Sequence, residues 1–318
     1  MQTSRRAACH LVERGFAMDK SYLIYPKRGY GQDQEFYAWR MSGKRDKLNW
    51  ERDAKVLVSL IIPIEFFPLN PSGVPFKHPG SMVTPYPDLR HFTVRDYGNR
   101  VGIYRILNAL FAQNLKAGFA FNSEAANRYP PLLKSIQDAG HEIIAHGVST
   151  DHIHHEGLSE AEESSLIIKA LGKFDAQPTG WLSPARNQSS RTLALLAKAG
   201  LSYHLDWEMD QVPTTMTTEN GEITALPNSY EISDFTLLHT RRQSEESWLQ
   251  QIKDSVELLR DEHDRFGGQM LALTLTPYIM GQPFRIWALR EMLAMLANDP
   301  DVNVVTPNQI NTEFKAQS

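Results

Sequence analysis

Apolar residues along this chain form short unbroken runs that alternate with helical stripes. The clearest run, residues 56–68, reads VLVSLIIPIEFFP. A nearly continuous run of Val, Leu and Ile predicts a strand buried on both faces, as in a parallel sheet covered by helices. Glu65 lies at the C-terminal end of this run. Because an isolated buried charge is costly, we expect Glu65 either to take part in chemistry or to have a structural role, capping a helix or pairing with an arginine.

Strand and helix patterns follow one another through the rest of the chain. Further strands are expected at 116–121, 142–145, 180–182, 203–205, 223–226, 270–275 and 302–305. Helices are expected at 98–113, 130–139, 159–174, 191–199, 244–266 and 285–297, and after Thr306-Pro307. The alternation predicts an α/β fold with a parallel sheet, and seven or eight such units in about 250 residues favour a β/α barrel over an open sheet.

Chemistry in a β/α barrel takes place at the C-terminal ends of the strands. The residues expected at those ends are Glu65, His146, Ser183, Asp206 and Thr276. All are polar, although the strands before them are apolar. The sequence therefore predicts a site at this end of the barrel.

Two segments lie outside the alternating pattern. Residues 1–54 are polar and rich in both charges, and we expect an arm that wraps the domain or a neighbouring subunit, with the barrel domain at 55–318. The segment 68–88 is a long Pro/Gly-rich loop, and a loop of that length in a compact enzyme is usually functional.

Composition narrows the choice of partners. The net charge of -4 offers no basic stripe for nucleic acid and no polybasic patch for a membrane surface. Cys9 is the one cysteine, which excludes a disulfide framework and a thiolate metal cluster. The first residues contain no apolar core of a signal peptide, so we expect a cytoplasmic protein. The expected partners are a small-molecule substrate and further copies of the chain, as a dimer or tetramer.

Four stretches resemble one known family, the polysaccharide deacetylase superfamily. They are IPIEFFPL at 62–69, GHEIIAHGVS at 140–149, GWLSPA with LLAKAGLSYHLDW within 180–207, and LTPYIMGQPFR at 275–285. The chain is most similar to the cytosolic branch that includes metal-independent allantoinases and cyclic-imide hydrolases. The resemblance implies a distorted seven-stranded β/α barrel, (β/α)7, and hydrolysis of a carbon–nitrogen bond other than a peptide bond, in an acetamido group or a small amide, ureide or cyclic imide.

The sequence departs from the family pattern at its metal ligands. The first family motif supplies a base and then a ligand, and here these positions hold Glu65 and Phe66. The second motif spaces two histidine ligands four residues apart, and here it holds His146 and Thr150. Two of three ligands are missing, so we expect a metal-independent site without a cofactor, with zinc as the alternative. Thr276 occupies the position of the family's acidic histidine, and its hydroxyl does not titrate near neutral pH.

The resemblance and the chemistry of amide hydrolysis together suggest roles. Glu65 is the expected base, His146 the group that orients the carbonyl or acts as the acid, and Asp206 the group that holds the His146 tautomer. Substrate contacts are expected from Thr150, Ser183, Arg186, Trp207, Glu231, Thr276 and Arg285. The two arginines are candidates for a substrate carboxylate, since guanidinium binds it bidentately. Structural interpretations are also open. His146 is alternatively a core histidine whose hydrogen bonds are satisfied, Asp206 a cap of the next turn, and Arg186 and Arg285 members of surface or structural ion pairs.

Two alternatives to a metal-independent hydrolase remain open. The cluster Asp151, His152, His154 and His155 is a candidate for a relocated metal site of a metal-dependent deacetylase, or a solvated loop. The losses at Phe66, Thr150 and Thr276 also suit a non-catalytic family member that binds a ligand or supports an oligomer.

Overall fold

The computed structural model describes residues 34–71 and 87–317. The chain separates into two compact units, Met1–Arg40 and Met41–Ser318. In the described part of the first unit, the Gln34 side-chain oxygen accepts hydrogen bonds from the backbone N–H groups of Phe36 and Tyr37. The second unit holds the sheet and its helices. Most of the 68–88 loop lies outside the described residues.

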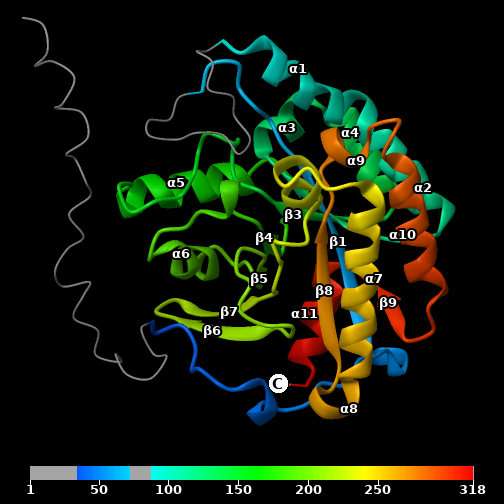
Figure 1. Cartoon of the computed structure of the whole chain (residues 1–318). Coiled ribbons are helices and arrows are strands. Elements are labelled where there is room, and N and C mark those ends of the chain that lie inside the picture. Colours follow the sequence, from blue (N-terminus) through cyan, green and yellow to red (C-terminus); the bar gives the residue numbers. More distant parts are fainter. Residues whose placement is uncertain (1–33, 72–86, 318) are drawn as a thin grey trace, which may run out of the picture. The chain divides into compact units, whose positions relative to one another are not determined.

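A sheet of nine strands, counted among the described residues, is the centre of the second unit (Figure 1). The strands are β1 (Val56–Ile64), β2 (Gly118–Phe121), β3 (Glu142–Ala145), β4 (Gly180–Trp181), β5 (Tyr203–His204), β6 (Thr214–Thr218), β7 (Gly221–Ala225), β8 (Gln269–Thr274) and β9 (Val302–Val304). Their order is β6-β7-β5-β4-β3-β2-β1-β8, and β9 pairs with β1. The pairs are parallel except for the β6–β7 hairpin. The sheet is strongly curled, which confirms the predicted distorted barrel.

Strand β1 lies in the middle of this arrangement. Its C-terminal half pairs with β2, its N-terminal half with β9, and its other edge with β8. Val58, Leu60 and Ile62 face the cluster beneath the helices, whereas Leu57 and Ile61 face the interior cluster. Every residue of β1 is buried, so the prediction of a strand covered on both faces is confirmed.

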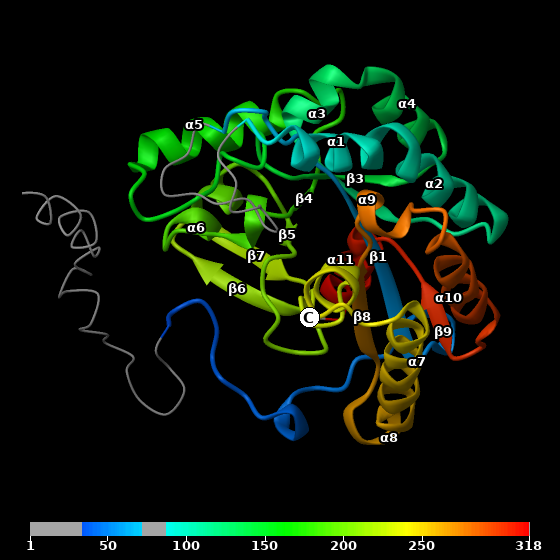
Figure 2. The same cartoon turned by 45° about the horizontal axis from the view of Figure 1, so that its top comes forward.

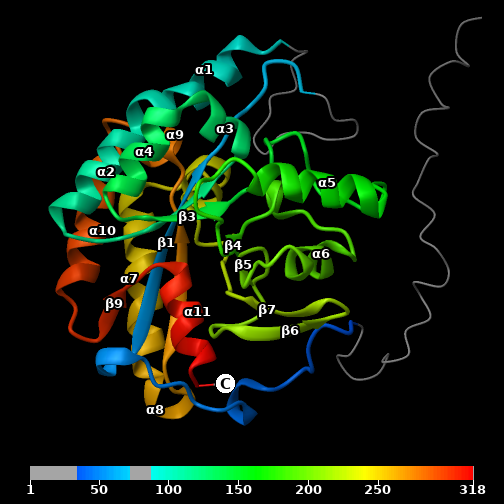
Figure 3. The same ribbon diagram turned by 180° about the vertical axis from the view of Figure 1, so that it is seen from behind.

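Helices surround the curled sheet (Figures 2 and 3): several cover its outer face, and the last one packs through Ile310 on the interior cluster. They are α1 (Leu89–Tyr97), α2 (Ile103–Ala112), α3 (Ser123–Arg128), α4 (Pro130–Asp138), α5 (Glu160–Leu171), α6 (Thr192–Lys198), α7 (Glu245–Asp261), α8 (His263–Phe266), α9 (Pro277–Met280), α10 (Ile286–Asn298) and α11 (Pro307–Lys315). The predicted capping box of Ser159 and Glu162 opens α5, and Gly200 follows α6 with a positive φ of 83°. None of the helices in the described ranges is long and apolar enough to cross a membrane.

Local structure differs from the prediction in three places. Helix α1 precedes the expected helix start and joins α2 through a π turn, Gly98–Gly102 (η4). Strand β6 was missed because TTMTT carries few apolar residues, although Asn220-Gly221 beside it is a hairpin signal. Within the expected arm, residues 41–54 lie in the barrel unit, since Leu48 and Trp50 are buried in the interior cluster.

Close packing of α9 on the π turn depends on glycine, and we expect Gly102→Ala to destabilise the protein. A Cβ at Gly102 would lie 2.2 Å from the carbonyl oxygen of Pro277, so the two backbones would have to separate. We expect a loss of about 1–3 kcal/mol in the free energy of unfolding, measured by urea denaturation. Gly43→Ala is the control, because nothing lies within 4 Å of its Cβ position. Equal midpoints for the two variants would contradict this packing.

Candidate active site

A cavity of about 420 Å³ opens at the C-terminal end of the strands. Its wall includes all five strand-end residues expected from the sequence: Glu65, His146, Ser183, Asp206 and Thr276. They follow β1, β3, β4, β5 and β8 respectively, with one intervening residue before Ser183, Asp206 and Thr276. Residues from five distant parts of the chain therefore share one space.

Glu65 and His146 form the closest pair of titratable groups at the wall. Oε1 of Glu65 lies 3.5 Å from Nε2 of His146, and both side chains are largely buried, 19% and 4% exposed. Nδ1 of His146 lies 2.7 Å from the carbonyl oxygen of Leu182. Because a carbonyl can only accept, Nδ1 carries the proton and Nε2 is the atom that faces Glu65. The expectation that Asp206 holds this tautomer is therefore wrong; a backbone carbonyl does.

Asp206 instead fixes the segment after β4. Its carboxylate accepts the backbone N–H of Ser183 at 2.6 Å, the Ser183 hydroxyl at 2.8 Å, and an N–H of Gln188. These bonds occupy both carboxylate oxygens. Asp206 thus shapes the cavity wall without touching His146.

Among the described residues that line the cavity, Arg186 is the one arginine. Its guanidinium donates to the carbonyl of Asn228 and, at 3.2 Å, to the hydroxyl of Thr274, and lies 3.6 Å from Glu208. Ala185 and Arg186 both have positive φ, 56° and 53°. Two adjacent non-glycine residues in this conformation store backbone strain at the cavity wall.

Thr276 is joined to a buried carboxyl group. Asp234 accepts the backbone N–H of Thr276 at 2.6 Å and its hydroxyl at 2.8 Å. Burial raises the pKa of Asp234 from 3.8 to about 7, although these hydrogen bonds and nearby Arg285 act in the opposite direction. A carboxyl group that holds its proton near neutral pH therefore lies behind a hydroxyl of the cavity.

Four residues expected to contact substrate do not line the cavity, and these expectations are corrected. The Thr150 hydroxyl donates to the carbonyl of Phe66 at 3.1 Å, and the Trp207 indole donates to Gln188 at 2.9 Å. Glu231 is exposed and pairs with Arg241. Arg285 pairs with Glu245 at 2.8 Å. Each of the four side chains thus has a polar partner that does not line the cavity.

Asn122 is a site residue that the sequence analysis missed. Its side-chain oxygen accepts the backbone N–H of Phe66 at 2.9 Å, and its amide donates to the carbonyl of His146. It thereby connects the ends of β1 and β3, where Glu65 and His146 emerge. The signal was available, since Asn122 is the polar residue that directly follows β2.

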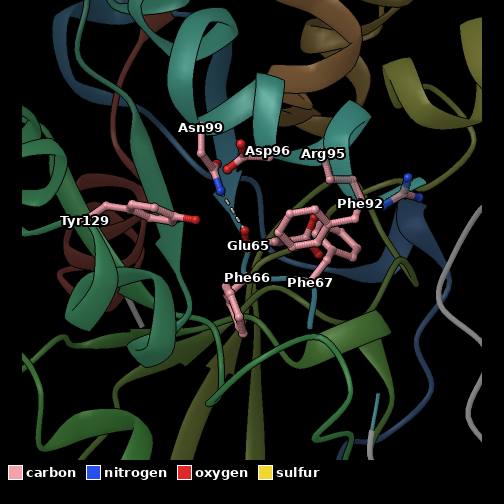
Figure 4. A pocket seen from close by; sticks show the side chains of 8 residues that line it. All are labelled: Glu65, Phe66, Phe67, Phe92, Arg95, Asp96, Asn99 and Tyr129. Atoms are coloured by element: carbon pink, nitrogen blue, oxygen red, sulfur yellow. Dashed lines mark hydrogen bonds between the residues drawn. The ribbon is translucent and has the colours of Figure 1, made fainter. Parts of the chain in front are cut away.

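A small hollow of about 10 Å³ adjoins Glu65 (Figure 4), with room for about one water. Arg95, Asp96 and Tyr129 are among the residues that line it. The Asn99 amide donates to the carbonyl of Glu65 at 2.8 Å, the bond drawn in Figure 4. Helix α1 thus lines the hollow beside Glu65, and the π turn holds the Glu65 backbone through Asn99.

The residues at the family's metal-ligand positions do not fit a metal ion. The Phe66 ring packs under the Arg128 guanidinium, 4.1 Å from the ring centre, and Thr150 is bound to the Phe66 carbonyl. His146 is left as the one imidazole of the three ligand positions. Over the described ranges, no group of three or more His, Cys, Asp or Glu side chains is placed to hold a metal ion.

The histidine cluster after residue 150 does not form a relocated metal site. His154 is buried and lies 3.1 Å from Glu163, whereas His152 contacts Ser149 and Asp151. His155 accepts the N–H of Gly157. The imidazoles face different partners, so the donors do not converge.

Known proteins resemble this chain in sequence and in fold. The sequence model of the polysaccharide deacetylase family matches residues 93–204. A peptidoglycan deacetylase from Helicobacter pylori is 30% identical over 111 residues, which cover 34% of this chain and 37% of that protein. The crystal structure of PuuE allantoinase has a TM-score of 0.74 at 20% identity, covering 86% of this chain and 94% of that one. That of a probable polysaccharide deacetylase from Pseudomonas aeruginosa has a TM-score of 0.75 at 20% identity, covering 86% and 95%.

Fold and site together define a distorted β/α-barrel protein with a cavity at the C-terminal ends of its strands. Residues 93–204 match the polysaccharide deacetylase family, and the barrel as a whole is similar in fold to a probable polysaccharide deacetylase. The chain spans little more than a third of the Helicobacter relative's length.

The buried carboxyl of Asp234 makes stability depend on pH. In the folded protein it keeps its proton up to about pH 7, whereas the unfolded chain ionises near its ordinary value of 3.8. Its contribution to stability is therefore fully present below about pH 4 and is lost as the pH rises to about 7. We expect Asp234→Asn to remove this decline, measured as the wild-type minus variant difference in unfolding free energy by urea titration at each pH. A difference that stays constant between those pH values would contradict the raised pKa.

Proposed function

We propose that this protein hydrolyses a carbon–nitrogen bond other than a peptide bond, in a small amide, ureide or cyclic imide. The observation that carries the proposal is the Glu65–His146 pair, 3.5 Å apart at the wall of a cavity of about 420 Å³. A cavity of this volume suits a small molecule. The fold likeness to an allantoinase supports the same class of substrate.

Glu65 and His146 together are suited to activating a water molecule. With Nδ1–H bound to the Leu182 carbonyl, Nε2 of neutral His146 and the carboxylate of Glu65 are both acceptors. A water on the cavity side of this pair donates one hydrogen to each acceptor, which directs a lone pair of its oxygen into the cavity. In the attack on the substrate carbonyl, Glu65 takes the proton as general base, and the imidazole orients the water.

The opposite groups of the wall are suited to holding the substrate. Arg186 offers guanidinium N–H groups to a substrate carbonyl or carboxylate, with Glu208 beside it for a substrate N–H. Phe67, Tyr230 and Tyr278 provide flat apolar surface for a ring. This combination of one cation, acceptors and aromatic faces favours a compact polar heterocycle or amide over an extended polymer.

The proposed reaction proceeds without a metal ion. Phe66 and Thr150 cannot supply the ligands that the family pattern places there, and their side chains are engaged in other contacts. Glu65 and His146 must then activate water by proton acceptance alone.

The proposal is tested by comparing wild type with Glu65→Gln on allantoin, hydantoin, succinimide and N-acetyl sugars. We expect wild type to hydrolyse at least one of the small amides or imides, and the variant to lose about 100-fold or more in kcat, because the general base is gone. Glu231→Gln is the matched control, since Glu231 is exposed and does not line the cavity. Elemental analysis of the active protein should show no stoichiometric metal.

Each contrary outcome identifies a different failure. Equal rates for wild type and Glu65→Gln would remove Glu65 as the base. No hydrolysis of any compound by wild type would favour a non-catalytic ligand-binding member of the family. Stoichiometric metal whose removal abolishes activity would contradict the metal-independent mechanism.

A further inference from the structure

Amide hydrolysis also requires a proton for the departing nitrogen, and the roles proposed for Glu65 and His146 concern only the attacking water. The proposed function therefore leaves a chemical role unfilled. The inference that follows rests on that function and concerns the β8 side of the same cavity, where Thr276 meets Asp234.

Thr276 is placed beside the base. Strands β1 and β8 are neighbours and parallel, with Ile61 opposite Thr274, so Glu65 and Thr276 emerge from adjacent strand ends. His146 emerges from β3, on the other side of β1 with β2 between them. His146 and Thr276 therefore lie on opposite sides of Glu65. When a water held by Glu65 and His146 attacks the substrate carbonyl, the Thr276 hydroxyl lies on the β8 side of Glu65.

Behind Thr276 lies a carboxyl group without access to solvent. Asp234 is 0% exposed and precedes the π turn Phe235–Thr240 (η6). Both of its oxygens bind Thr276, through the backbone N–H and the hydroxyl. Asp234 also accepts the backbone N–H of Phe235, so its carboxyl group joins the start of this turn to the cavity residue Thr276.

The charged and titratable groups around Asp234 come from several elements, chiefly α9, the start of α10 and α7. Arg285, at the start of α10, favours the ionised carboxylate but is neutralised by Glu245 of α7. Tyr278 of α9 faces Asp234, Glu65 and Arg95 and has its own pKa raised by burial. Burial remains the largest influence on Asp234, and its pKa of about 7 leaves it protonated in a large fraction of molecules at neutral pH.

We propose that Asp234 and Thr276 form a proton relay that delivers a proton to the leaving nitrogen of the substrate. Asp234 is the source of the proton, and Thr276 is the group that contacts the substrate and donates to it. The relay takes the place that a titrating side chain would occupy at residue 276.

The proton balance of the relay is complete. When Asp234 is protonated, its Oδ1–H donates to the Thr276 oxygen across the same 2.8 Å contact, which frees the Thr276 hydroxyl to donate into the cavity. As the carbon–nitrogen bond breaks, the nitrogen takes the proton of the Thr276 hydroxyl, and the Thr276 oxygen takes the carboxyl proton of Asp234. Asp234 is left as a carboxylate, still bound by the backbone N–H of Thr276 at 2.6 Å. After the products leave, the proton that Glu65 removed from water returns through the water that refills the cavity to the Thr276 hydroxyl, which passes a proton back to Asp234. The net reaction is amide plus water giving acid plus amine.

The experiment compares Thr276→Val, Thr276→Ser and Asp234→Asn with wild type on the small amide or imide that wild type hydrolyses. Valine keeps the shape but loses the hydroxyl, and we expect kcat to fall about 100-fold. Serine restores the hydroxyl, and we expect a rate within about threefold of wild type, which a purely structural role of Thr276 would not predict. Asp234→Asn should lose about 100-fold as well.

The pH profile provides a second readout. Wild-type kcat should fall as the pH rises above about 7, because the carboxyl must be protonated to act, and Asp234→Asn should lack this limb. Independently of turnover, the infrared difference spectrum of wild type against Asp234→Asn should show a protonated carboxyl band at neutral pH.

The failure of the relay can be separated from the failure of the proposed function. Wild-type rates in Thr276→Val, with Glu65→Gln inactive, would overturn the relay and leave the hydrolase. A serine variant as slow as the valine variant, an unchanged alkaline limb in Asp234→Asn, or no carboxyl band would also overturn the relay. A wild type inactive on every compound would overturn both.

Discussion

The candidate site depends on one side chain that holds two strand ends together. Asn122 accepts from the backbone of Phe66 and donates to the carbonyl of His146, so the residues after β1 and β3 cannot move apart without breaking one buried and one part-buried hydrogen bond. Unpaired buried polar groups cost about 1–3 kcal/mol each, which makes the separation unfavourable. The distance between Glu65 and His146 follows from this bridge more directly than from any contact between the two side chains.

The common direction of parallel strands explains why the sequence could predict most of the fold. Apolar runs separated by helical stripes can bury themselves only in a parallel sheet with helices outside it, and parallel strands end on the same side. The convergence of Glu65, His146, Ser183, Asp206 and Thr276 follows from that geometry. Strand β6 was missed because a half-exposed threonine strand has no apolar signature.

Hydrogen-bond partners were harder to predict than positions. A side chain at a strand end can turn toward the cavity or toward a loop, and the choice depends on which backbone groups need partners. Asp206 turns to Ser183, and the tautomer of His146 is set by a carbonyl that no residue type identifies in advance. Arg285 was expected to contact substrate, but a neighbouring helix supplies Glu245.

The π turn limits where residues can be inserted or deleted between α1 and α2. A π turn contains one residue more than the α-helical turn it replaces, and each residue of an α-helix turns the chain by about 100°. Removing one residue within Gly98–Gly102 would restore a regular helix but rotate Asn99 away from the Glu65 carbonyl, or displace α2 along its axis. Insertions and deletions in this turn are therefore expected to displace Glu65, whereas the same change in an exposed loop would leave the Glu65 carboxylate in place.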